Sequence, residues 1–119
     1  MFKQIIFVGL GGAAGSIFRF LISVLINKHY SMYFPISTFV INIIGCFCIG
    51  LFAGLFPTNS DLRLLLIVGF CGGYTTFSTF ASENLYLLQN NQIIVAIIYT
   101  LLSVLIGILA VWLGLQISK

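Results

Sequence analysis

The sequence predicts an all-α membrane protein, with four transmembrane helices in a single domain that covers residues 1–119. Apolar residues make up 61% of the chain and charged residues only 6%, against roughly 25% charged in soluble domains. A helix needs about 20 apolar residues to cross a bilayer, and polar clusters divide the chain into four such stretches. A water-soluble domain is therefore excluded. We expect helices near residues 4–27, 34–56, 62–88 and 92–116.

The first helix, 4–27, carries Arg19 in its interior. It is longer than the roughly 7 to 15 apolar residues of a signal peptide, so we expect it to remain in the protein. A charge at mid-span costs about 2.5 to 3.5 kcal/mol, and Arg19 and Glu83 are the charges that fall well inside the predicted spans. Three roles are open for Arg19: its side chain reaches the interface, pairs with Glu83, or draws an anion toward a pathway.

The second and fourth helices each carry a line of polar side chains. Thr38 and Asn42 lie four positions apart on the second, and Tyr99 and Ser103 lie four positions apart on the fourth. Residues at this spacing share a helix face. Each line serves either as contacts between helices, worth about 0.6 kcal/mol per hydrogen bond, or as the wall of a polar pathway.

The third helix, 62–88, is predicted to break near its middle. The Gly72-Gly73 pair is followed closely by hydroxyl residues, a composition that weakens a helix in lipid. Backbone carbonyls freed at membrane depth are tolerated only inside protein or beside water, and they commonly bind cations. The carbonyls of Gly72 and Thr75 are therefore candidate ligands for a sodium-sized ion.

Two lines of side chains are predicted beyond the break. Phe77 and Phe80 lie three positions apart on one helix face, and Thr76, Thr79 and Glu83 follow the spacing of a neighbouring face. An aromatic stripe is thus expected to run beside a polar one.

The connections between the helices are short, so neighbouring helices are expected to run antiparallel. Both termini then lie on one side with Lys3, Arg63 and Lys119, and Lys28 lies on the other. Three basic residues against one mildly favour cytoplasmic termini and leave insertion in both orientations open. Four spans cannot enclose a sizeable pathway within one copy, so we expect oligomerisation.

Other features receive no functional assignment. The five basic residues form no cluster, so no nucleic-acid partner is expected. Cys46, Cys48 and Cys71 lack the spaced Cys and His partners of a zinc site, and we interpret them as small hydrophobic residues at helix contacts. The pair Gly11 and Gly15 allows helix backbones to approach closely.

At these residues the sequence resembles the Fluc (also called CrcB) family of fluoride ion channels. The resemblance covers the whole chain and is carried by Gly11–Phe20, Ser37–Gly45 and Gly72–Phe80. It implies an antiparallel, dual-topology dimer in the cell membrane, with two fluoride pores and a structural sodium ion at the dimer centre. It also implies passive export that protects against fluoride toxicity, without an enzymatic reaction.

The resemblance further implies roles for individual residues. Gly72 and Thr75 would supply the sodium-binding carbonyls, and the polar line of the fourth helix departs from the family at Gly107, where a further hydroxyl is expected. The implied residues of the fluoride pore are Phe77, Phe80, Asn42, Thr38, Tyr99, Ser103, Thr76, Thr79, Arg19 and Glu83.

Physical chemistry supports a fluoride pathway, because this small and strongly hydrated anion needs replacement hydrogen-bond donors when it loses water. Asn42 and the hydroxyls can donate, and the positive edges of phenylalanine rings can contact an anion. Conduction requires several weak sites, which such groups provide.

Two other function classes fit the sequence less completely. Proton-coupled exporters of the small multidrug resistance type have nearly the same length but depend on a buried glutamate in the first helix, and this chain has no acidic residue before Asp61. A non-transporting membrane scaffold would explain the glycines but not the aligned donors. Whether the partner is an identical copy or a paralogue stays open.

Overall fold

The computed structural model describes all residues, Met1–Lys119, and its regular elements are all helices. The elements are α1 (Phe2–His29), α2 (Ile36–Leu55), α3 (Asp61–Arg63), the π-helical segment η1 (Leu64–Cys71), α4 (Gly72–Tyr74), α5 (Ser78–Gln89) and α6 (Ile93–Ser118). Elements α3 to α5 together form the third span, Asp61–Gln89, and four spans are long and apolar enough to cross a membrane. The predicted fold class of four helices with a broken third helix is confirmed, and the chain is a multi-pass membrane protein.

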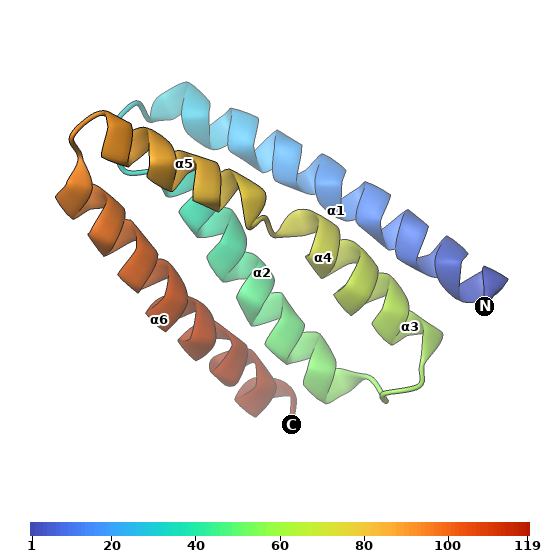
Figure 1. Cartoon of the computed structure of the whole chain (residues 1–119). Helices are drawn as coiled ribbons and strands as arrows, with labels where there is room; N and C mark the ends of the chain where they lie inside the picture. The colour runs from blue at the N-terminus through green and yellow to red at the C-terminus, as the bar shows by residue number, and fades with distance from the viewer.

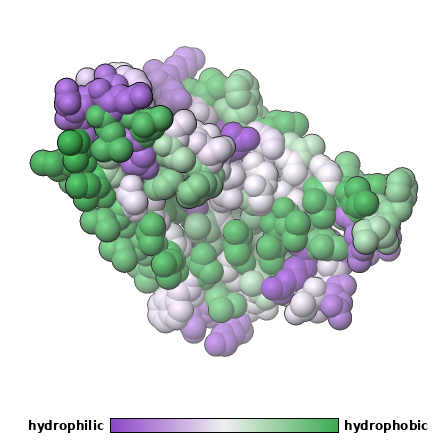
Figure 2. Space-filling model, in the orientation of Figure 1, coloured by the Kyte–Doolittle hydropathy of each residue, from purple (hydrophilic) through white to green (hydrophobic).

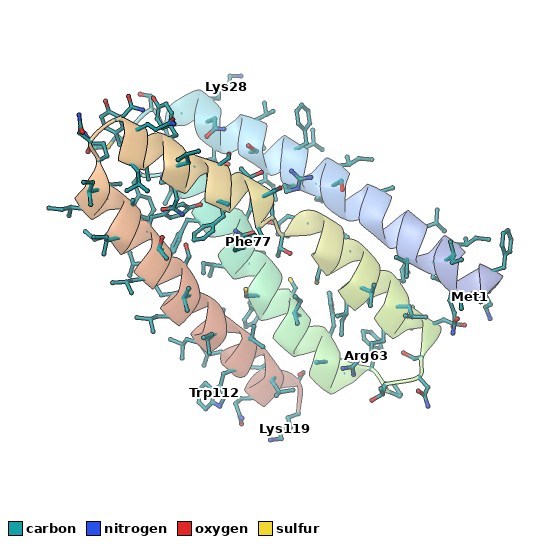
Figure 3. The ribbon with its side chains drawn as sticks, viewed as in Figure 1. Met1, Lys28, Arg63, Phe77, Trp112 and Lys119 are labelled. Atoms are coloured by element: carbon teal, nitrogen blue, oxygen red, sulfur yellow. The ribbon has the colours of Figure 1, made fainter.

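The four spans run alongside one another in alternating directions (Figure 1). Both termini and the connection from α2 to α3 lie at one end, and the other two connections lie at the opposite end. Lys28 marks one end, and Met1, Arg63 and Lys119 mark the other (Figure 3). The molecule extends 47 Å along its longest axis, enough to cross about 30 Å of hydrocarbon.

Hydrophobic residues cover the middle of the face seen in Figure 2, and hydrophilic residues gather toward the two ends. This distribution is the one expected when apolar side chains contact lipid tails and polar side chains reach the headgroups. Two basic residues at the end with the termini have structural partners. Lys3 pairs with Asp61 at 3.0 Å, and Arg63 donates to the carbonyls of Ala53 (3.3 Å) and Phe56 (3.1 Å), where α2 ends.

Close backbone contacts join α1 to the third span. Gly15 is buried, and a Cβ atom added there would lie 2.8 Å from the Tyr74 nitrogen and also meet the Phe70 carbonyl oxygen. Helices in lipid gain little from the hydrophobic effect and associate through such close packing. The glycines of α1 therefore fix the position of η1 and α4.

The third span breaks at residues 75–77, between α4 and α5 (Figure 1). Thr75 is extended, with φ −80° and ψ 158°. The Gly72-Gly73 pair, which predicted the break, is itself helical and belongs to α4. Its second glycine serves packing, because a Cβ atom on Gly73 would lie 2.6 Å from the Gly12 carbonyl oxygen of α1.

Candidate functional site

The break is held by the side chain of Asn42, which extends from α2. Its Nδ2 donates to the Thr76 carbonyl (3.0 Å), and its Oδ1 accepts from the Thr76 N–H (2.8 Å). A buried peptide group outside regular structure needs replacement partners, and the Asn42 amide supplies both for Thr76. An amide nitrogen carries two hydrogens, so one N–H of Asn42 stays available for a further acceptor.

A groove of about 290 Å³ opens beside the break, between α2 and α6. Phe77 projects there from the middle of the molecule (Figure 3) and is 78% exposed in the single chain. Its ring centroid lies 5.9 Å from that of Phe80. The residues that line the groove are Asn42, Cys46, Ile49, Thr75, Thr76, Phe77, Phe80, Ser103 and Val104.

The groove contains a polar group that has no partner within the chain. The hydroxyl oxygen of Ser103 is buried and makes no hydrogen bond. A buried hydroxyl without a partner costs free energy, and such groups in native structures commonly meet a water or an ion. Ser103 and Asn42 therefore both present unused donor capacity to one groove.

A carboxylate cluster lies next to the groove, formed by Thr38, Glu83 and Tyr99. Thr38 Oγ1 donates to Glu83 Oε2 (2.7 Å), and the Tyr99 hydroxyl donates to Glu83 Oε1 (2.8 Å). Tyr99 is fully buried, and its ring centroid lies 4.9 Å from that of Phe80. The three side chains come from α2, α5 and α6, so the cluster connects three spans at the groove's aromatic wall.

Arg19 lies apart from this cluster. Its Nε donates to the Gly73 carbonyl at 3.2 Å, at the end of α4 that faces the break. A cation at a helix C-terminus is favourable because the unpaired carbonyls there carry partial negative charge. The ion pair with Glu83, one of the roles left open by the sequence, is not formed.

The carbonyls of Gly72 and Thr75 lose their usual helical donors at the break. The Thr76 N–H, which would reach Gly72 in a continuous helix, donates to Asn42 instead (2.8 Å). The Thr79 N–H, which would reach Thr75, donates to Thr76 Oγ1 instead (3.2 Å). Gly72 is also exposed on the surface of the single chain. Both predicted carbonyls are thus free to accept from, or coordinate, another group.

The structure separates residues that the sequence grouped together. Thr76 precedes α5 and its hydroxyl caps the first turn of that helix, so the prediction that it shares a helix face with Thr79 and Glu83 is wrong. Thr79 lines neither the groove nor the carboxylate cluster. Helical spacing does not apply to Thr76, because α5 begins two residues later, at Ser78.

Sequence reasoning also missed residues of the groove, namely Cys46, Ile49 and Val104. Cys46 was interpreted as a packing residue. The available signal was its position four residues after Asn42 and eight after Thr38, which continues the polar line on α2.

Comparison with known proteins identifies the family. Residues 6–115 match the family described as CrcB-like protein, Camphor Resistance (CrcB). A protein from Flavobacterium psychrophilum named fluoride-specific ion channel FluC is 49% identical over 121 residues, which cover 98% of this chain and 98% of the relative. A protein of the same name from Azobacteroides pseudotrichonymphae is 42% identical over 100% of this chain and 98% of its own. Another from Phocaeicola vulgatus is 42% identical over 98% of this chain and 99% of its own. The chain therefore belongs to the CrcB-like family.

Proposed function

We propose that this chain forms a fluoride-selective channel of the cell membrane, through which cytoplasmic fluoride leaves passively. The observation that carries the proposal is the groove, where the donors Asn42 and Ser103 face a path that the rings of Phe77 and Phe80 border. The relatives named fluoride-specific ion channel support the identity of the ion. No ATP hydrolysis or other enzymatic step is part of the proposal.

The groove's chemistry suits a small anion that must lose water. The free N–H of Asn42 and the hydroxyl of Ser103 replace part of the hydration shell, and the Phe77 and Phe80 ring edges carry partial positive charge. None of these groups is a full charge, so the ion is held weakly enough to leave, as conduction demands. The Thr38–Glu83–Tyr99 cluster orients hydroxyls beside this path.

A second copy completes the pathway in this proposal. The groove is open on one side, and Phe77 is 78% exposed although it lies at mid-span. We propose that an antiparallel partner, inserted in the opposite orientation, covers this face and that the dimer contains two pores. The partner is either an identical copy or a paralogue.

The function is tested with liposomes that contain only this purified chain. They should release fluoride down its gradient without a proton gradient or nucleotide, and barely release chloride, because a narrow path excludes the larger anion. Equal chloride flux, or flux that needs a proton gradient, would remove the channel and favour an antiporter. An inert chain that becomes active with a co-expressed paralogue would contradict only the homodimer.

A structural sodium ion fits the freed carbonyls. Neutral backbone oxygens are suitable ligands for a hard cation, and Gly72 and Thr75 each present one without its helical donor. Two copies related by a two-fold axis would contribute both carbonyls twice and enclose one ion between them. The ion then supports the dimer and is not transported.

Replacement of sodium by N-methyl-D-glucamine throughout purification should dissociate the dimer or lower fluoride flux, and return of sodium should reverse the loss. A sodium gradient across active vesicles should not drive fluoride. Uphill fluoride movement powered by sodium alone would make the ion a coupled substrate, and an unchanged dimer with unchanged flux in sodium-free buffer would remove the site.

A further inference from the structure

We infer that Cys46 extends the fluoride path beyond Asn42 and Ser103, as a neutral thiol that takes the place of a hydroxyl. This inference rests on the proposed function and adds a residue to the same groove. Cys46 is half-buried and free of any disulfide, and its side chain lines the groove together with Asn42 and Ser103.

The register of α2 places Cys46 on the same face as Thr38 and Asn42. Thr38, Asn42 and Cys46 are spaced by four residues, so they follow one another along one helix face. Thr38 Oγ1 donates to Glu83 Oε2 at 2.7 Å, and the Asn42 amide bonds to the Thr76 carbonyl (3.0 Å) and N–H (2.8 Å). Cys46 is the next group along this line, on the side of Asn42 away from Thr38.

The opposite wall of the groove, on α6, lacks a polar side chain next to Cys46. Tyr99, Ser103 and Gly107 are also spaced by four residues, and the last of them has no side chain. A Cβ atom added to Gly107 would have the sulfur of Cys46 as its nearest neighbour, at 3.5 Å. The thiol thus lies next to Gly107, where the line of polar side chains on α6 ends.

The chemistry of the thiol suits this position. The hydroxyl of Ser103 is buried without a partner in the chain, so this part of the groove already holds one unused donor. A thiol is a weak donor, and sulfur is polarisable. It can therefore assist an anion that leaves Ser103 without binding it tightly. Cys48, two positions further on, points to a different side of α2 and does not line the groove.

Substitutions separate a donor role from packing. Cys46→Ala should lower fluoride flux at least about tenfold, the effect expected when one hydrogen bond to an ion is lost. Cys46→Ser should stay within about threefold of wild type, because it restores a donor of similar size. The double variant Cys46→Ala with Gly107→Ser should recover flux, because the new hydroxyl grows from the opposite wall into the same place. Cys48→Ala is the matched control and should conduct normally.

Thiol modification provides an independent readout. In a chain that retains Cys46 alone (Cys48→Ala, Cys71→Ala), methyl methanethiosulfonate should form the methyl disulfide, reduce flux at least about tenfold as loss of the same donor does, and be reversed by dithiothreitol. A chain that retains Cys48 alone (Cys46→Ser, Cys71→Ala) should keep its flux.

Several outcomes would overturn the inference while leaving the channel intact. They are wild-type flux from Cys46→Ala, wild-type flux from the fully modified Cys46 chain, equal inhibition of the Cys48 chain, or failure of Cys46 to react in the folded protein. A wild-type chain that does not conduct fluoride would instead remove the proposed function, and the inference with it.

Discussion

Asn42 uses its side chain first on the protein itself, because both its amide oxygen and its amide nitrogen bond to Thr76. The same side chain lines the groove with one remaining N–H. A substitution at this position therefore acts on the geometry of the break and on the anion path at once. Glu83 likewise uses its side chain on the protein itself, since each of its carboxylate oxygens accepts a hydrogen bond from a hydroxyl.

Asn42→Asp should reduce fluoride flux at least about tenfold, which corresponds to about 1.4 kcal/mol. A carboxylate cannot donate to the Thr76 carbonyl, and its negative charge lies in the path of an anion. Flux from liposomes gives the measurement. Asn90→Asp is the control, because Asn90 donates to the Tyr86 carbonyl (2.8 Å) in an exposed turn and its loss should leave flux unchanged. Equal flux from both variants would restrict Asn42 to packing.

Tyr99→Phe should lower the free energy of unfolding by about 1 to 3 kcal/mol, because it removes the hydrogen bond from the phenol to the carboxylate of the half-buried Glu83. Flux should fall several-fold, since without this hydrogen bond the Tyr99 ring, 4.9 Å from that of Phe80 at the groove wall, is held less firmly. Thermal unfolding in detergent and fluoride efflux report the two effects. Tyr86→Phe, at a side chain that is 57% exposed, should change neither; a similar loss there would show that the phenol of Tyr99 has no special role.

The sequence does not show which of these side chains contact each other when they are far apart in the chain. Spacing alone places Thr38 beside Asn42 and Tyr99 beside Ser103. In the structure Thr38 and Tyr99 both bond to Glu83 of α5, and Asn42 bonds to Thr76 at the break. Spacing offers no means of choosing a partner for Arg19, which bonds to the Gly73 carbonyl rather than to Glu83. That choice depends on how α1 packs against α4, which no local pattern encodes.

The third span shows how a helix is interrupted at membrane depth without leaving its backbone unsatisfied. η1 and α4 pack against the glycine face of α1, α5 begins anew at Ser78, and side chains of Asn42 and Thr76 supply the hydrogen bonds that the ladder lacks. Irregular backbone in a membrane is tolerated only with such substitutes.

Composition predicted that this span breaks within the stretch of glycines and hydroxyl residues that ends at Phe80, and the break lies there, but composition did not identify the residues that leave the helix. The Gly72-Gly73 pair was the strongest local sign of a break, yet both residues are helical because their small size is used against α1. The break falls at Thr75–Phe77 because Asn42 binds Thr76 there. The π-helical winding of η1 also lacks a local signal, since Leu64–Cys71 is a uniform apolar run.

Gly15→Ala should destabilise the protein by about 1 to 3 kcal/mol, the usual cost of forcing a methyl group into a packed contact. The new Cβ would press on the Phe70 carbonyl and on the Tyr74 nitrogen, 2.8 Å away, and both belong to backbone that cannot give way easily. Gly9→Ala is the matched control, because nothing lies within 4 Å of its added Cβ. The midpoint of thermal unfolding in detergent should fall for the first variant alone, and equal midpoints would show that the α1 contact is loose.

The two ends of the helix bundle each carry few charges. Lys3, Arg63 and Lys119 lie at the end with the termini, and Lys28 lies at the other. Basic residues near span ends set orientation, and an excess this small is compatible with insertion both ways. The exposed position of Phe77 on the open side of the groove gives a second copy a surface to cover.

Lys28→Gln should force a single orientation, because it removes the basic residue that opposes the other three. If the active species is an antiparallel homodimer, flux should then be lost. Flux should return when this chain is co-expressed with one biased the other way, by Lys3→Gln, Lys119→Gln and Asn27→Lys. Labelling of a cysteine added beyond Lys119, in a background without the native cysteines, reports orientation. Full flux from chains that all face one way would show that the partners are not antiparallel.

The Asn42–Thr76 hydrogen bonds also bear on how transport varies with temperature. They hold the irregular backbone of the third span in one conformation, since bending the span there would break two hydrogen bonds worth about 0.5 to 1.5 kcal/mol each. Exporters that alternate between inward-open and outward-open shapes need such segments to flex. The proposed channel needs no such flexing, so its flux should rise with temperature less steeply than that of an exporter that alternates between two shapes.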